Sequence, residues 1–192
     1  MKIKINCCEK EIPENVINFL ESDTIGMTHC QTFNPLLKKF YRGKNANKAR
    51  IHHNFEVVRL ERSDSSNNSI IINPKHRIFW ADIKNKKEVT KRKIFLKMTP
   101  ILEPTSYLMK KEEEKNLLPN LEGIGPDQKK IQNIHNCAYV DSFGTYLMSL
   151  LVEKKLCPSF PLFFGTLNGL ANKYYYDVSD EIDSFQNQDW YR

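Results

Sequence analysis

A lysine stands inside a short apolar run near the middle of the chain. The segment Ile94-Phe95-Leu96-Lys97-Met98 has the composition of a β-strand, and Lys97 is its only charged residue. Such a lysine either lies on the solvent-facing side of a strand, which is the common position for lysine, or is held where it meets an anion such as a phosphate. Residue types alone leave both interpretations open.

Metal and nucleophilic chemistry are less well supported. Three doublets, Cys7-Cys8, His29-Cys30 and His52-His53, contain residues of zinc-ligand type. Structural zinc sites generally use C-x₂₋₄-C knuckles, whereas adjacent residues of a strand point to opposite faces. We therefore predict no metal site. No G-x-S-x-G elbow marks a serine nucleophile, and we nominate no catalytic residue.

Charge is distributed unevenly along the chain. The net charge of the 192 residues is +6, but residues 176–192 contain five acidic residues and one basic residue, which leaves +10 on the rest. A basic body attracts phosphates, nucleic acid or an acidic partner. Six basic residues lie between Lys84 and Lys93. We predict that this turn is either a solvated hairpin tip or a contact for nucleic acid or an acidic protein surface, although it contains few aromatic residues for base stacking.

Length and composition limit the class of protein. A hydrophobic content of 40% is enough for one core, and no run approaches twenty apolar residues, so we predict no membrane span. The N-terminus lacks the apolar segment of a secretory signal. Five cysteines at irregular spacing do not form a disulfide pattern, and we therefore expect a reducing compartment.

A series of strands is predicted in the middle of the chain. β-Branched and aromatic residues alternate with polar turns, a pattern typical of a β-meander. The expected strands cover 55–61, 70–73, 77–82 and 93–98, and a buried strand is expected over 160–167.

Helices are predicted on both sides of this meander. A short helix is expected over 12–20 and another over 105–119. The clearest helical pattern covers 139–155, where apolar residues recur at helical spacing. Gly144 lies inside it and costs helix stability, so we expect it to mark a close approach.

The elements predict an α+β fold, in which an antiparallel sheet of about five strands packs on one main helix. Residues 1–54 are predicted to form a helical or irregular N-terminal extension, residues 55–175 the sheet-and-helix domain, and residues 176–192 an acidic tail. Trp190 and Tyr191 in that tail are either a docking segment or packed on their own domain.

The order of these elements resembles the N-terminal lobe of a protein kinase. There a strand lysine binds the α- and β-phosphates, and a glutamate of the following helix holds that lysine. Ala81 and I-F-L-K (94–97) stand where the second strand and V-A-I-K of a kinase stand. The segments IFLKMTPILEPTSYLMKK (94–111) and HNCAYVDSFGTYLMSLLVEKKLCPSFPLFFGTLNG (135–169) resemble kinase-like proteins of nucleocytoplasmic large DNA viruses. The resemblance covers roughly residues 55–175.

This resemblance implies a cofactor, partners and a location. The cofactor would be ATP with Mg²⁺, and the cofactor-binding residues would be Lys97 and Asp141. Asp141 is also suited to the first turn of a helix by the helix dipole. The resemblance implies other viral or virion proteins as partners, and the virion or the cytoplasm of an infected host cell as the location.

Several parts of a kinase do not occur in this sequence. No G-x-G-x-x-G precedes Ala81, and neither H-R-D nor D-F-G occurs, although these motifs supply the catalytic base and a metal ligand. D-S-F-G at 141–144 lies inside the predicted helix. We therefore expect a degenerate or partial kinase-like domain that is not catalytic by itself and acts as a virion-associated structural or interaction protein. The alternative is an N-lobe fragment of an active viral Ser/Thr kinase that binds ATP through Lys97.

Overall fold

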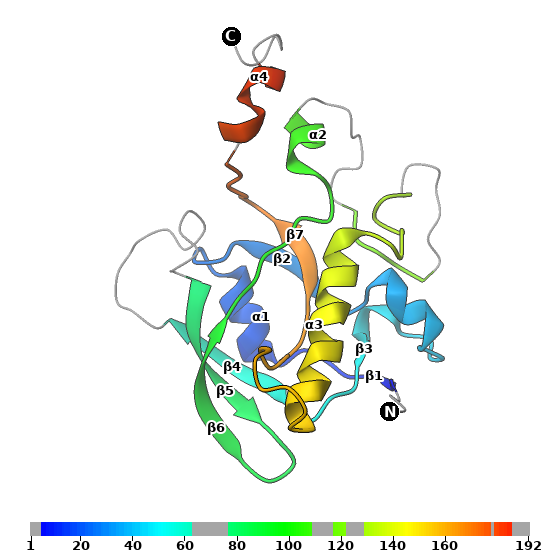
Figure 1. The fold of residues 1–192 in the computed structure, drawn as a ribbon, viewed down its shortest axis with the longest axis vertical. Coiled ribbons are helices and arrows are strands. Elements are labelled where there is room, and N and C mark those ends of the chain that lie inside the picture. The colour runs from blue at the N-terminus through cyan, green and yellow to red at the C-terminus, as the bar shows by residue number, and fades with distance from the viewer. Residues whose placement is uncertain (1–4, 63–76, 109–116, 122–128, 178, 186–192) are drawn as a thin grey trace.

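The protein is a mixed α+β structure with small antiparallel sheets. The computed structural model describes residues 5–62, 77–108, 117–121, 129–177 and 179–185. Within these ranges the strands form three sheets, β1-β3, β2-β7 and β4-β5-β6 (Figure 1). The strands are β1 (Cys7–Glu9), β2 (Met27–Gln31), β3 (Ala49–Ile51), β4 (Glu56–Arg62), β5 (Ile78–Lys84), β6 (Val89–Phe95) and β7 (Asn168–Ala171).

One long helix and several short ones accompany the sheets. Helix α3 begins after Asn136, whose side chain accepts a hydrogen bond from the Ala138 N–H and so caps the helix. None of the described helices is long and apolar enough to cross a membrane. The helices are α1 (Glu14–Glu21), α2 (Pro104–Leu108), α3 (Cys137–Glu153) and α4 (Ile182–Phe185), with 3₁₀ helices η1 (Pro35–Lys39), η2 (Ala46–Lys48) and η5 (Ser179–Glu181).

Helix α1 covers the inner face of the three-stranded sheet. Alternate residues of β5 are buried, because successive side chains of a strand point to opposite faces. Phe79 is 1% exposed, and its ring meets the Phe19 ring edge-on at 5.3 Å. Val16 and Leu20 of α1 join the same core. This packing leaves the other face of the sheet to polar and partly exposed residues.

Helix α3 packs on a second core, formed with N-terminal segments. Tyr146 of α3 is 3% exposed and lies in a cluster with Phe33, Leu37 and Phe163. The Tyr139 hydroxyl is also buried and donates a hydrogen bond of 2.8 Å to the Ile131 carbonyl oxygen. The two cores thus use different helices.

The single five-stranded sheet that the sequence predicts is not observed. β1-β3 and β2-β7 are separate pairs, and the described residues place only β4, β5 and β6 in one sheet. The main helix α3 packs on the second core, whereas the short α1 covers that sheet. An amphipathic pattern shows that a helix has a partner but does not identify the partner, which explains this error.

The strand predicted over 160–167 is also not observed. The Phe163 N–H donates to the buried Ser149 Oγ at 2.9 Å, so it is not available to a strand partner. Phe163 lies in the second core and Phe164 in the first. Pro161 has no N–H to donate. The segment is therefore an extended bridge between the two cores, and β7 begins after it.

The other predicted elements are placed as follows. The strands predicted over 55–61 and 77–82 correspond to β4 and β5, and the helices predicted over 12–20 and 139–155 correspond to α1 and α3. β6 ends at Phe95, so Lys97 follows the strand instead of lying within it. The N-terminal extension also contributes β1, β2 and β3. The following predictions lie outside the described residues: the strand over 70–73, residues 109–116 of the helix over 105–119, and Trp190 with Tyr191.

Candidate functional site

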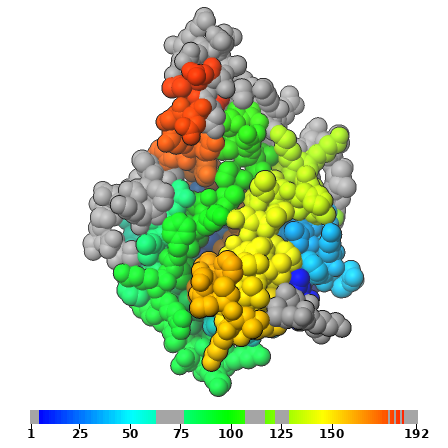
Figure 2. All heavy atoms as spheres, in the orientation of Figure 1, coloured from blue at the N-terminus to red at the C-terminus, as the bar shows by residue number. Residues whose placement is uncertain are grey.

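The two residues predicted to bind a cofactor lie in contact. Lys97 Nζ donates a hydrogen bond of 2.8 Å to Asp141 Oδ1 and lies 2.7 Å from Asp141 Oδ2. Lys97 comes from the segment after β6, where the Leu96 N–H donates to the Arg77 carbonyl oxygen at 2.8 Å. Asp141 comes from the first turns of α3. In Figure 2 the green segment that follows β6 lies against the yellow helix.

This ion pair is open to solvent. The Lys97 side chain is 59% exposed and the Asp141 side chain 40% exposed. An ammonium group has three N–H donors, so a contact with one carboxylate leaves donors for another anion. Lys97 is therefore solvent-exposed and held in position by Asp141.

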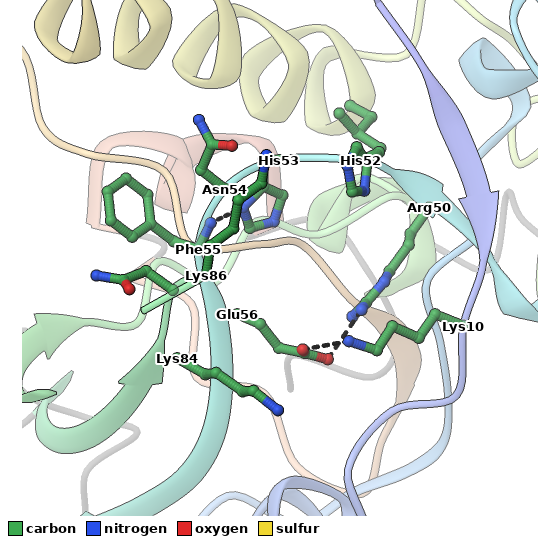
Figure 3. A pocket seen from close by; sticks show the side chains of 11 residues that line it. Lys10, Arg50, His52, His53, Asn54, Phe55, Glu56, Lys84 and Lys86 are labelled. Atoms are coloured by element: carbon green, nitrogen blue, oxygen red, sulfur yellow. Dashed lines mark hydrogen bonds and ion pairs between the residues drawn. The ribbon is translucent and has the colours of Figure 1, made fainter. Parts of the chain in front are cut away.

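A pocket lies at the opposite end of the three-stranded sheet (Figure 3). Its volume is about 180 Å³. It is formed where the ends of β1 and β3 approach the start of β4 and the turn between β5 and β6. The charged and imidazole side chains that line it are Lys10, Arg50, His52, His53, Glu56, Lys84 and Lys86.

Glu56 is the centre of the polar contacts in this pocket. It accepts a hydrogen bond of 2.8 Å from Arg50 Nη2 and another from Lys10 Nζ. Figure 3 shows both cations converging on the carboxylate. Partial burial alone would raise the pKa of Glu56, but the hydrogen bonds from Lys10 and Arg50 outweigh it and the pKa is lowered. Glu56 is therefore ionised at neutral pH.

His53 adds a neutral imidazole to the same pocket. Burial, assisted by the charge of Arg50, lowers the pKa of His53 to about 4. The Phe55 N–H donates to His53 Nδ1 at 3.2 Å, so the proton of the neutral ring lies on Nε2. The ring also meets the Phe163 ring edge-on at 5.7 Å. His53 can thus donate one hydrogen bond through Nε2.

The basic segment from Lys84 to Lys93, predicted as one turn, divides into two groups, because β5 ends at Lys84 and β6 begins at Val89. Lys84 and Lys86 line the pocket. Lys91 pairs with Glu61, and both Lys91 and Lys93 lie over the Trp80 ring, at 6.0 and 5.2 Å from its centroid. The turn is therefore not uniformly solvated.

Sequence reasoning missed Trp80 as a partner of these lysines. Trp80 lies directly opposite Lys93 in the register of β5 and β6, so both side chains share one face. The signal was present in the alternation of β5, where Phe79 and Ala81 are buried and Trp80 is only partly buried. An aromatic residue out of phase with the buried positions points to the outer face.

The cysteine and histidine doublets do not come together as a ligand set. Cys8 Sγ lies 4.0 Å from His52 Nδ1. All five cysteines are free. Burial raises the pKa of Cys7 and of Cys30 to about 11, so both thiols are protonated at neutral pH. In the part of the chain that the structure describes, no group of three His, Cys, Asp or Glu side chains is arranged to hold a metal ion.

Comparison with family models, with curated proteins and with solved structures gives no match to this chain. The resemblance to viral kinase-like proteins therefore rests on the sequence segments 94–111 and 135–169. Any function has to be argued from the geometry of the two sites.

Proposed function

We propose that this chain is a kinase-like binding domain in which Lys97, positioned by Asp141, receives the phosphates of Mg-ATP, and that it does not transfer phosphate by itself. The observation that carries the proposal is the contact between Lys97 and Asp141. It joins a lysine at the end of a strand meander to a carboxylate in the helix that comes later in the chain. An N-terminal kinase lobe joins a strand lysine to a helix glutamate in a similar way.

Two features of the pair support phosphate binding. The side chain of Lys97 is exposed enough for a ligand to reach its ammonium group. Both Asp141 oxygens contact this group and restrict the conformations of the Lys97 side chain. Lys97 therefore loses less conformational entropy when a ligand binds. An aspartate is shorter than the glutamate of a typical kinase, and the lysine lies beyond the end of β6, so the two groups meet at a position displaced from the strand.

The proposal assigns binding and not catalysis. The sequence has no H-R-D base and no D-F-G metal ligand, and D-S-F-G at 141–144 is part of α3. It also lacks the glycine-rich loop whose backbone N–H groups cover the phosphates. We therefore expect weak nucleotide affinity that depends strongly on Lys97.

A thermal-shift titration with Mg-ATP tests this function. Wild type should show a melting temperature that rises with nucleotide concentration, because a ligand that binds only the folded state stabilises it. Lys97→Ala should abolish the shift, and Asp141→Asn should reduce it. Lys154→Ala is the matched control, since it removes one exposed positive charge at the C-terminal end of α3 and should keep the wild-type shift. Absence of a shift in wild type would rule out nucleotide binding.

A second candidate is a virion structural or interaction protein that binds no nucleotide. Exposed apolar residues on α3 and just after it favour this function. Met148, Leu156 and Phe160 are 36%, 63% and 40% exposed. Such residues are typical of surfaces that a partner covers when they lie together. The same titration separates the two candidates, because only the first predicts a shift that Lys97→Ala removes.

A further inference from the structure

We propose that the pocket between Lys10, Arg50 and Lys84 is a second anion site, which binds the phosphate group of a small phosphate monoester. This proposal goes beyond the function proposed for Lys97 and does not depend on it. It rests on the charge of the lining, on two cations that have no partner among the described residues, and on the shape of the site in Figure 3.

The lining carries a large excess of positive charge. Lys10, Arg50, Lys84 and Lys86 face a single carboxylate, that of Glu56. His52 and His53 also line the site, and His53 is neutral at physiological pH. With one carboxylate among four cations, the net charge of the lining is +3. A concave surface with one sign of charge concentrates ions of the opposite sign.

Two of these cations are not neutralised by any residue in the part of the chain that the structure describes. Glu56 already accepts hydrogen bonds from Arg50 and Lys10. Lys84 lies directly opposite Glu56 in the register of β4 and β5, so it shares the same face. Neither Lys84 nor Lys86 makes a side-chain hydrogen bond or ion pair within the described ranges. An anion would relieve the repulsion among these cations.

The donors come from separate parts of the chain and surround the pocket. Arg50 lies in β3 and Lys84 in β5, and Lys10 follows β1. In Figure 3 the Lys84 side chain extends beside Glu56, and Arg50 and Lys10 approach from the other side. The folded chain, and not one flexible loop, therefore places the charges.

The donor set fits a phosphate group better than a carboxylate. A phosphate monoester carries a charge of about −1.5 to −2 and three strong acceptor oxygens. The guanidinium of Arg50 offers a fork of donors, lysine ammonium groups offer rotating donors, and His53 Nε2 offers a single N–H. The carbon side of the ester would meet Ile51 and Phe55, which also line the pocket.

This pocket is separate from the Lys97–Asp141 pair. Lys84 is paired with Val89 at one end of the β5-β6 hairpin, whereas Lys97 follows Phe95 at the other end. Six residues of an extended strand span about 20 Å. A single phosphate group therefore cannot bridge the two sites.

Two ligands, inorganic phosphate and phosphoserine, test the proposal. Their binding is measured by ³¹P NMR titration and by thermal shift. Wild type should bind both ligands, and Lys84→Ala with Lys86→Ala should weaken binding roughly tenfold. Lys91→Ala with Lys93→Ala is the matched control, because it removes the same charge from the same hairpin outside the pocket. NaCl at equal ionic strength controls for general screening.

Glu56→Gln gives a sharper result, because the variant should bind phosphate more tightly than wild type. It removes the competing negative charge and releases Arg50 and Lys10. Equal stabilisation by NaCl, or equal losses in the two double-lysine variants, would overturn the proposal. Binding of phosphoserine but not of inorganic phosphate would show that the ester group is required, which also supports the site. Lys97→Ala should keep phosphate binding here, so failure of one proposal is distinguishable from failure of the other.

Discussion

The Lys97 ammonium group contacts both carboxylate oxygens of Asp141, at 2.8 and 2.7 Å, although 44 residues separate them in the sequence. The contact links the end of the three-stranded sheet to helix α3. These two elements belong to different hydrophobic cores, so the ion pair is a polar connection between two separately packed parts of the molecule.

This ion pair should contribute little to stability. Exposed pairs gain only about 0.2–1 kcal/mol, because water screens the charges and two side chains lose conformational freedom. A double-mutant cycle of Lys97→Ala and Asp141→Ala, measured by urea unfolding, should give a coupling energy below about 1 kcal/mol. The coupling should decrease at high salt. A coupling above about 2 kcal/mol that is insensitive to salt would contradict this expectation.

Acidification should destabilise the protein through His53. Its pKa is about 4 in the folded protein, against 6.5 for an ordinary histidine. Between these values the unfolded chain binds more protons than the folded one, so the free energy of unfolding falls as pH is lowered from 6.5 to about 4. The total loss is roughly 3 kcal/mol.

Urea unfolding over this pH range measures the effect of His53. The decline should be smaller in His53→Gln and should persist in His52→Gln, the exposed neighbour. Glu56 has a lowered pKa, so its contribution is lost only as pH falls below its ordinary value of 4.5. An equal decline in His53→Gln would show that another group is responsible.

Ser149→Ala should be strongly destabilising, although it removes only one hydroxyl group. Ser149 is 1% exposed, and within the described residues its Oγ is the acceptor of the hydrogen bond from the Phe163 N–H, at 2.9 Å. Removing the acceptor leaves a buried N–H unsatisfied, which costs about 1–3 kcal/mol. Ser142→Ala in the same helix is the control, since the Ser142 hydroxyl acts as a donor, to the Tyr139 carbonyl oxygen of its own helix. Similar melting temperatures for the two variants would refute the role of Ser149.

Gly144→Ala should stabilise helix α3. The sequence suggested a close approach at this glycine, but a Cβ added there would meet nothing within 4 Å. The gain should be about 1 kcal/mol, the difference in helix propensity between the two residues. Gly43→Ala provides the contrast, because its Cβ would collide with Glu9 Oε1, which accepts the Tyr41 hydroxyl at 2.7 Å. Thermal unfolding should therefore show opposite signs for the two variants.

The parts of the fold that depend on local pattern could be predicted. Strand β5 follows from periodicity, because buried positions alternate along it with less buried ones. Helix α3 follows from the helical spacing of its apolar residues, and β4 from its content of β-forming residues. Phe163 shows where this reasoning fails. Its apolar neighbours suggest a strand, but its N–H is bonded to a helix side chain, and no local pattern indicates that partner.

The two sites differ in how far the sequence predicted them. Lys97 and Asp141 were paired through a resemblance in the order of elements, and the structure places them in contact. The second pocket was not predicted, because Lys10, Arg50 and Lys84 are brought together by two separate strand pairings, β1 with β3 and β4 with β5. Lys84 could only be seen as one member of a basic run until its register opposite Glu56 was known.

The pairing of β2 with β7 also has a consequence for how the chain reaches its fold during synthesis. Thr28 Oγ1 donates to the Leu170 carbonyl oxygen across 142 residues. At about 5–20 residues per second, a ribosome makes β7 roughly 7 to 28 seconds after β2. The β5-β6 hairpin closes within microseconds of its own synthesis. We therefore expect β2 to remain an open strand edge for most of translation, available to pair with another chain until β7 is made.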